Sequence, residues 1–167
     1  MSLDNIELTP FLIQELFKNS LVELYDTEPE KKTKQVVPFN VLGNNKKKVI
    51  IIVDNDETAY LPDIELNFLL GILSACKLTM EDVAILNIKK NKSVSYKAIE
   101  LELKAEKIIL FGVGSVQIEL PFEFPHYQIQ QYNNQTYVSA AMLLHIQDDK
   151  AEKTKLWNCL KQVFSIQ

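Results

Sequence analysis

An acidic tetrapeptide, Asp54-Asn55-Asp56-Glu57, follows directly on the apolar run Val49–Val53. Three carboxylates so close together can bind a cation or activate a water molecule, and catalytic acids often lie at the end of a buried strand. The same residues also favour a solvated turn, because Asp and Asn side chains hydrogen-bond to backbone groups two or three residues further on. The pattern therefore predicts either a reactive site or a turn, and both interpretations stay open at this point.

Two more polar residues stand where neighbouring strands are expected to end. Asn87 lies in the run Val83–Ile88, and Ser139 lies near the end of Thr136–Ala140. In parallel sheets, the carboxyl ends of the strands meet at one edge, where ligands bind. The candidate pocket at this edge, either a ligand pocket or the remnant of one, comprises Asp54, Asn55, Asp56, Asn87 and Ser139.

The histidines and cysteines argue against a metal or a cofactor. His126 and His145 are isolated from each other and from Cys76 and Cys159, and no HxxxH, HExxH or CxxC spacing occurs. The stretch Gly112-Val113-Gly114-Ser115 lacks the Gly-Lys-Ser/Thr continuation of a phosphate-binding loop. We expect no metal, no cofactor and two reduced cysteines in the core.

Composition limits the class of partner. The chain is 47% hydrophobic and 24% charged, with a formal net charge of −4, which is ordinary for a globular protein. All 18 basic residues are lysines, so the chain lacks the arginine fork that recognises phosphate and guanine. This argues against sequence-specific binding of nucleic acid and favours a protein partner. No apolar run approaches the roughly 20 residues of a membrane span, and no basic-flanked leader is present, so we expect a cytoplasmic protein without membrane association.

Hydrophobic periodicity predicts strands that alternate with helices. The expected strands are Val49–Val53, Val83–Ile88, Ile108–Phe111, Tyr127–Gln131 and Thr136–Ala140, with Asn133-Asn134 as the expected hairpin turn between the last two. The expected helices start at Pro62, span Ser95–Lys104 and span Asp148–Phe164. Such alternation implies crossover connections, and hence an α/β protein with a mainly parallel sheet between helices.

The N-terminal part follows a different pattern. Thr9 and Pro10 can start a helix, and we predict a helix in residues 1–25. Residues 26–47 are polar and irregular and are predicted as a linker, with a short extended piece at Phe39–Leu42. Residues 48–167 are predicted as the α/β domain. Because 167 residues suit one hydrophobic core, we expect the whole chain to form one structural domain.

The segment Lys48–Ile88 resembles the first half of the uracil-DNA glycosylase superfamily, where a strand ends in the catalytic loop and a helix and a second strand follow. Ala105–Gly112 is similar to the third core strand of that superfamily, and Val138–Phe164 to its last strand, loop and closing helix. The resemblance implies a three-layer α/β/α fold over Lys48–Phe164.

The departures from this superfamily fall on its chemistry. Active members have a Gly-rich loop after the first strand and a His-Pro motif after the last strand. Here Val53–Glu57 contains neither Gly nor Pro, and Ser139-Ala140 stands in place of the His-Pro motif. Asn87 coincides with an asparagine that reads uracil in some members, although a turn residue also fits this position. Without the backbone cradle and the imidazole, glycosidic cleavage lacks its electrostatic support.

The stretch Val53–Val83 and the ending Asp148–Leu160 resemble more closely the psi-subunit family of bacterial DNA polymerase III, a non-enzymatic group with this fold. The shared order is strand, Asn-Asp loop, proline, helix and short acidic turn. In that family an N-terminal segment binds the clamp-loader ATPase subunits, and the globular part binds the chi subunit. The resemblance implies clamp-loader and chi-like partners for this chain. The implied contact residues, which suit intramolecular packing equally well, are Phe11, Leu12, Leu16 and Phe17.

The leading hypothesis from the sequence is therefore a non-catalytic adaptor of the psi type. One alternative is a divergent glycosylase, in which Asp54 or Asp56 positions a water molecule and Asn87 reads a base. Another alternative is a binding module unrelated to replication. The oligomeric state is left open.

Overall fold

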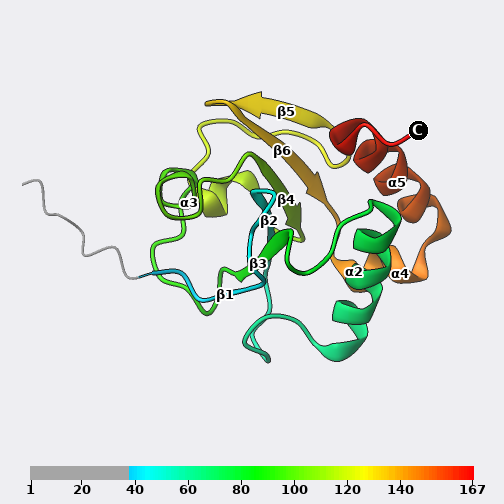
Figure 1. The fold of residues 1–167 in the computed structure, drawn as a ribbon, viewed down its shortest axis with the longest axis horizontal. Helices are drawn as coiled ribbons and strands as arrows, with labels where there is room; N and C mark the ends of the chain where they lie inside the picture. Colours follow the sequence, from blue (N-terminus) through cyan, green and yellow to red (C-terminus); the bar gives the residue numbers. More distant parts are fainter. Residues whose placement is uncertain (1–37) are drawn as a thin grey trace, which may run out of the picture. The chain divides into compact units, whose positions relative to one another are not determined.

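A six-stranded sheet runs through residues 38–167, the part of the chain that the computed structural model describes (Figure 1). The strands stand in the order β1-β3-β2-β4-β6-β5. The four central strands are parallel to one another, and the two edge strands β1 and β5 pair antiparallel. The predicted α/β class with a mainly parallel sheet is confirmed. The strands are β1 (Val41–Leu42), β2 (Val49–Val53), β3 (Val83–Asn87), β4 (Lys107–Phe111), β5 (Ile129–Tyr132) and β6 (Gln135–Ala140).

Strand β2 forms the centre of the sheet because its sequence suits burial on both faces. All five residues of Val-Ile-Ile-Ile-Val are buried. Side chains alternate across a strand, so Val49, Ile51 and Val53 enter one hydrophobic cluster while Ile50 and Ile52 enter the other. A continuous β-branched run is typical of a strand that is covered on both sides.

Helices supply the other walls of the two clusters. On one face lie α2 (Asp63–Ala75), α4 (Leu143–Asp148) and α5 (Lys150–Phe164), which contribute Leu69, Ile146 and Leu156. The opposite face is covered by α3 (Tyr96–Leu103) and the 3₁₀ helix η1 (Ser115–Ile118), through Ile99 and Ile118. Figure 1 shows α2, α4 and α5 together on one side of the sheet and α3 on the other.

The boundaries differ from the prediction at several places. The predicted strand Tyr127–Gln131 is observed as β5 at Ile129–Tyr132, because the backbone of Tyr127 has a positive φ. Strand β1 lies inside the range 26–47 predicted as a linker, and the compact unit begins at Pro38. The final helix does not run on from Asp148, because the backbone of Asp149 is extended and its carboxylate caps α5 by accepting from Ala151 N at 2.7 Å. The predicted helix in residues 1–25 lies outside the described residues.

Gly43 explains why the supposed linker belongs to the folded unit. Its φ is +109°, and a Cβ there would lie 2.3 Å from the carbonyl oxygen of Val83. This close approach lets the chain run along the turn before β3, where Asn45 N donates to Val83 O and Lys47 N donates to Asp82 O, each at 3.0 Å. The segment around Gly43 was predicted as a linker because its sequence is polar, but backbone hydrogen bonds fix its position.

Predictions for one turn and for the two cysteines are confirmed. Asn133 and Asn134 form the turn between β5 and β6, and both have the positive φ that a two-residue hairpin turn favours. Cys76 and Cys159 are free and buried, and burial raises the pKa of the Cys76 thiol to about 11. Between residues 38 and 167, no helix combines the length and the apolar character needed to cross a membrane.

Candidate functional site

The carboxyl ends of the parallel strands meet at one edge of the sheet, as predicted. The loop after β2 contacts the end of β3, where Asn55 N donates to Asn87 Oδ1 at 3.2 Å. The same loop contacts η1, where Gln117 Nε2 donates to Asp54 Oδ2 at 3.1 Å. We call this part of the surface the carboxyl edge.

Asn87 holds the loop after β2 in place. The residue is fully buried, and its Nδ2 donates to Asn55 O at 2.7 Å and to Thr58 O at 3.1 Å. Its Oδ1 accepts from the backbone N–H groups of Asn55 and Lys89. Both ends of the amide are therefore occupied by the protein's own backbone, which leaves the side chain little capacity to recognise a base.

Asn55 forms the turn that the sequence offered as one of two interpretations. Its Oδ1 accepts from Glu57 N and Thr58 N at 2.9 Å and from Thr58 Oγ1 at 3.1 Å. The side chain thus replaces backbone partners inside a tight loop. The carbonyl oxygen of the amide points into the loop. The side chain therefore fixes the conformation of the loop and does not present this acceptor at the open surface.

The two aspartates of the loop are only loosely paired. Lys89 Nζ lies 3.7 Å from Asp54 Oδ1 and 3.9 Å from Asp56 Oδ1, and Asp56 is exposed. Exposed ion pairs of this length contribute little to stability. Within residues 38–167, no group of three or more His, Cys, Asp or Glu side chains is arranged to hold a metal ion.

A cavity of about 370 Å³, which we call the acidic pocket, lies beside this loop. Its carboxylates belong to Asp54, Glu57 and Glu65, and no lysine or histidine lines it. The pocket does not include Asp56, Asn87 or Ser139. Apolar side chains form the rest of the wall, and they include Val53, Leu61, Phe111, Met142 and Leu143.

Glu65 is the residue of this pocket that the sequence analysis did not select. It is only 9% exposed, and burial raises the pKa of its carboxyl group. Glu65 is the third residue of α2, a position from which glutamate often bonds back to the N–H of the capping residue. The capping residue here is Pro62, which has no N–H, so this partner is missing. The spacing Pro-x-x-Glu, from Pro62 to Glu65, is the sequence signal that could have identified Glu65.

Ser139 belongs to a different cavity. Its Oγ lies 2.9 Å from His126 Nδ1, and both residues line a cavity of about 260 Å³ together with Ser115. This cavity shares no lining residue with the acidic pocket. A Cβ at Gly112 would meet Met142 Cγ at 2.5 Å, so the end of β4 is covered by Met142. The five residues of the candidate pocket are therefore not brought together around one space.

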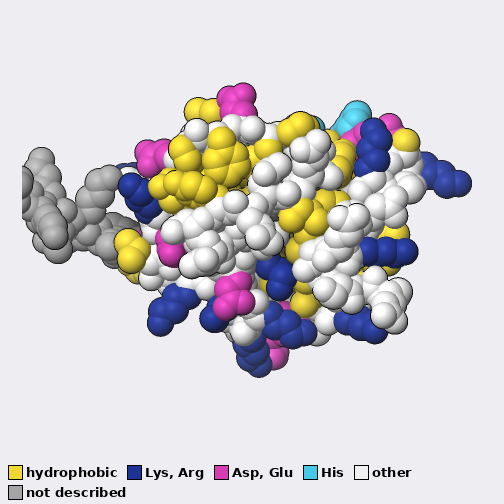
Figure 2. Space-filling model, turned by 90° about the horizontal axis from the view of Figure 1, so that it is seen from above, with side chains coloured by type: hydrophobic (Ala, Val, Ile, Leu, Met, Phe, Trp, Pro, Cys, Tyr) yellow, Lys and Arg dark blue, Asp and Glu magenta, His cyan; other side chains and the backbone are white. Residues whose placement is uncertain are grey.

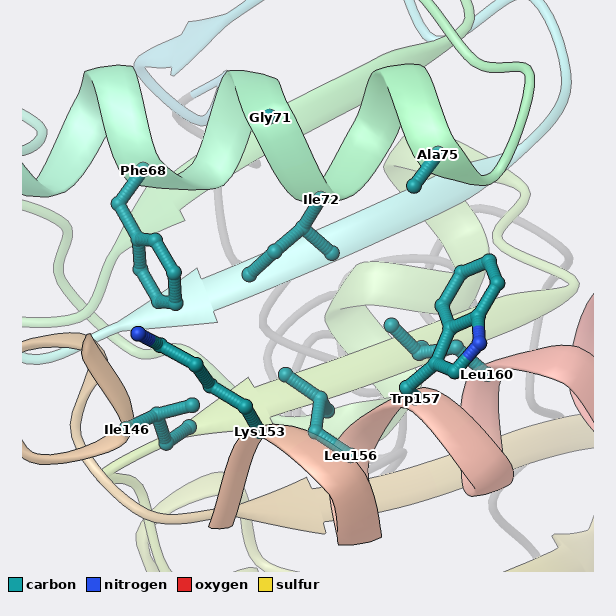
Figure 3. A pocket seen from close by; sticks show the side chains of 9 residues that line it. All are labelled: Phe68, Gly71, Ile72, Ala75, Ile146, Lys153, Leu156, Trp157 and Leu160. Atoms are coloured by element: carbon teal, nitrogen blue, oxygen red, sulfur yellow. The ribbon is translucent and has the colours of Figure 1, made fainter. Parts of the chain in front are cut away.

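A third hollow lies between α2 and α5, and we call it the helix groove (Figure 3). It has a volume of about 250 Å³, and its walls are almost entirely apolar. Figure 3 shows Phe68 and Ile72 of α2 facing Lys153, Leu156 and Trp157 of α5. Lys153 Nζ lies 5.8 Å from the centroid of the Phe68 ring, and Lys161 Nζ lies 5.6 Å from that of Trp157.

The lysines before β2 and the lysines after β3 do not join into one basic patch. Lys46, Lys47 and Lys48 precede β2 and pair with acidic neighbours, Lys47 with Asp82 at 3.3 Å. Lys89 follows β3 at the opposite end of the sheet, because β2 and β3 are parallel. Figure 2 shows lysines interspersed with other side chains on one face.

Comparisons with known proteins supply no family for this chain, since neither a protein-family model nor a curated protein matches it.

Proposed function

We propose that this protein is a non-catalytic adaptor of the psi type, built on a three-layer, glycosylase-like fold and acting in the replicative polymerase complex. The order of elements supports the fold part of this proposal. Strand, acidic loop, helix and strand follow one another as β2, Asp54–Glu57, α2 and β3, and the chain closes with β6 and the pair α4 and α5. This is the order in which the resemblance to the glycosylase superfamily runs.

The contacts of the carboxyl edge support a role without catalysis. A base-reading asparagine needs a free amide, but both ends of the Asn87 amide bond to the backbone. A general base needs to reach its substrate within a shaped pocket. Asp56 is exposed outside the acidic pocket, and His126 lies in the separate cavity with Ser139. Asp54 lines the acidic pocket, but its carboxylate accepts from Gln117 Nε2 at 3.1 Å and lies 3.7 Å from Lys89 Nζ.

The helix groove is the observation that carries the adaptor proposal. Its walls combine apolar side chains with Lys153, and no carboxylate lines it. An amphipathic segment whose apolar side chains enter the groove, and whose flanking carboxylates meet Lys153 and Lys161, complements this surface. The occupant that we propose is therefore an acidic amphipathic segment of a clamp-loader or chi-like subunit.

Gly71 allows this proposal to be tested without disturbing the core. It lies on the groove wall, and a Cβ at this position would meet nothing within 4 Å. The bulky substitution Gly71→Trp is expected to occupy the groove, whereas Gly71→Ala leaves it open. In affinity capture from cells, the unmodified protein and Gly71→Ala are expected to recover clamp-loader or chi-like subunits, and Gly71→Trp to lose them.

Two results would overturn the proposal. The first is the recovery of no replication subunit by the unmodified protein, and a partner outside replication would then support the independent binding module. The second is abasic product from uracil-containing single-stranded DNA that disappears in Asp56→Asn, because a non-catalytic adaptor releases no base. Equal capture by Gly71→Trp would exclude the helix groove as the contact surface.

A further inference from the structure

The acidic pocket carries an unbalanced negative charge. Asp54, Glu57 and Glu65 line it, and no basic side chain does. Lys89 Nζ lies 3.7 Å from Asp54 Oδ1, but Lys89 is not part of the pocket wall. A positively charged group that entered the pocket would therefore meet carboxylates without competing with an internal cation.

Among the carboxylates of the pocket, Glu65 would be stabilised most by a positively charged group. Its exposed fraction is 9%, and no hydrogen bond or ion pair to its carboxylate occurs among residues 38–167, while the carboxylate oxygens remain accessible from the pocket. A buried carboxylate is costly unless it is paired, and Pro62 removes the one backbone donor that its place in α2 would offer. The molecule retains a charged group at a position where Gln or Leu would be cheaper to bury.

The apolar part of the pocket wall determines which kind of positively charged group fits. Val53, Leu61, Phe111 and Leu143 are buried apolar side chains, so they favour an alkyl stem over a hydrated ion. Three apolar side chains of the lining are exposed, Ile64 at 64%, Met142 at 57% and Leu144 at 48%, and the lining residue Glu57 is exposed beside them.

We propose that the acidic pocket binds the side chain of a lysine or arginine that projects from a protein partner between apolar residues. The charged end reaches Glu65, the stem lies against Leu61 and Phe111, and the flanking apolar residues of the partner cover Ile64, Met142 and Leu144. A free amine would leave these three side chains exposed, which is why the pocket is assigned to a peptide segment. This site is separate from the helix groove and does not depend on the proposed function.

The test uses the full chain and the tripeptide acetyl-Leu-Arg-Leu-amide, with binding followed by NMR titration. The tripeptide is expected to shift the amide signals of Leu61, Glu65 and Leu144. In Glu65→Gln its affinity is expected to fall about tenfold or more, because one partner of a desolvated charge pair is removed. The matched control is Glu119→Gln, an exposed glutamate outside the pocket, which is expected to bind like the unmodified chain.

Further probes separate the possible sources of the charge. n-Butylguanidinium is expected to bind more weakly than the tripeptide, and acetyl-Leu-Gln-Leu-amide not to bind measurably. Undiminished affinity in Glu65→Gln, or equal affinity for the glutamine tripeptide, would overturn the proposal. Tighter binding of spermidine than of the tripeptide would overturn the assignment to a protein partner. Folding of Glu65→Gln is monitored by its amide spectrum, so a loss of binding cannot be confused with unfolding.

Discussion

Two buried polar side chains of the carboxyl edge differ in how they are satisfied. Asn87 lies in β3 with protein partners at both ends of its amide, whereas Glu65 lies in the first turn of α2 with no donor to its carboxylate among the described residues. Burial of a polar group is tolerated when its hydrogen bonds are replaced and costly when they are not. Asn87 is thus a source of stability, and Glu65 is a cost that a ligand can offset.

Asn87→Ala is expected to destabilise the protein by about 3 kcal/mol, because the backbone groups of Asn55 and Thr58 lose their partner inside the fold. The measurement is the free energy of unfolding in urea. Asn91→Ala is the control. Its side chain also bonds to backbone groups, at Asn40 and Asn87, but it is partly exposed, so water can replace it and a loss of about 1 kcal/mol is expected. Equal losses would contradict the conclusion that Asn87 holds the loop after β2 in place.

Glu65→Gln is expected to stabilise the protein at neutral pH. The helix N-terminus favours a negative charge by about 0.3–1 kcal/mol, so a raised pKa means that burial outweighs this benefit. With a folded pKa above the ordinary 4.5, the folded state favours the protonated carboxyl group. The stability that protonated Glu65 contributes to the folded state is present below pH 4.5 and is lost as pH rises through the folded pKa.

The midpoints of urea unfolding, measured between pH 7 and pH 4, therefore test the direction of this stability effect. The advantage of Glu65→Gln over the unmodified chain is expected to be largest at pH 7 and to shrink toward pH 4. Asp54 and Glu57 line the same pocket and remain in both proteins, and Glu119→Gln controls for the general loss of one negative charge. A variant that is less stable than the unmodified chain at pH 7 would show that Glu65 has a stabilising partner.

At the scale of elements, α2 joins the two candidate binding surfaces. Its first turn supplies Ile64 and Glu65 to the acidic pocket, and its later turns supply Phe68, Gly71 and Ile72 to the helix groove. Leu69 and Leu73 hold the helix against the sheet between these surfaces. The helix is therefore apolar on more of its circumference than packing against one sheet requires.

Gly71→Ala is expected to stabilise the protein by about 0.5–1 kcal/mol, because glycine in a helix interior costs backbone entropy and the added methyl group meets nothing within 4 Å. Thermal or urea unfolding measures the gain. Gly43→Ala is the opposite case, since a Cβ would lie 2.3 Å from Val83 O, and a loss of about 2 kcal/mol or more is expected. A destabilised Gly71→Ala would show that the groove side of α2 is closed.

For the whole molecule, the folded unit is expected to need residues 38–47. A chain that starts at Pro38 retains β1 and the packing of Phe39, Val41 and Leu42 against the two clusters. A chain that starts at Lys48 loses these contacts and is expected to be less stable by on the order of 3 kcal/mol. Urea unfolding of the two chains measures this difference, and equal stability would show that residues 38–47 are a linker after all.

Local patterns were sufficient for most of the central elements. Val49–Val53 was predicted with the bounds that β2 has, because a β-branched run indicates a buried strand whatever its neighbours are. The Asn133-Asn134 turn followed from the αL tolerance of asparagine. Strand β1 was predicted only as a short extended piece of a linker, because two residues carry no periodicity and their place at the sheet depends on the close approach at Gly43.

By itself, the sequence determined the α/β class, the parallel direction of the inner strands and the edge at which Asp54–Glu57, Asn87 and Ser139 would lie, since these follow from periodicity and chain direction. Only the tertiary structure decided what the polar residues of that edge do. Asn55 and Asn87 are 32 positions apart, so their hydrogen bonds exist only after folding. Whether a buried carboxylate such as Glu65 has a partner depends likewise on distances in space.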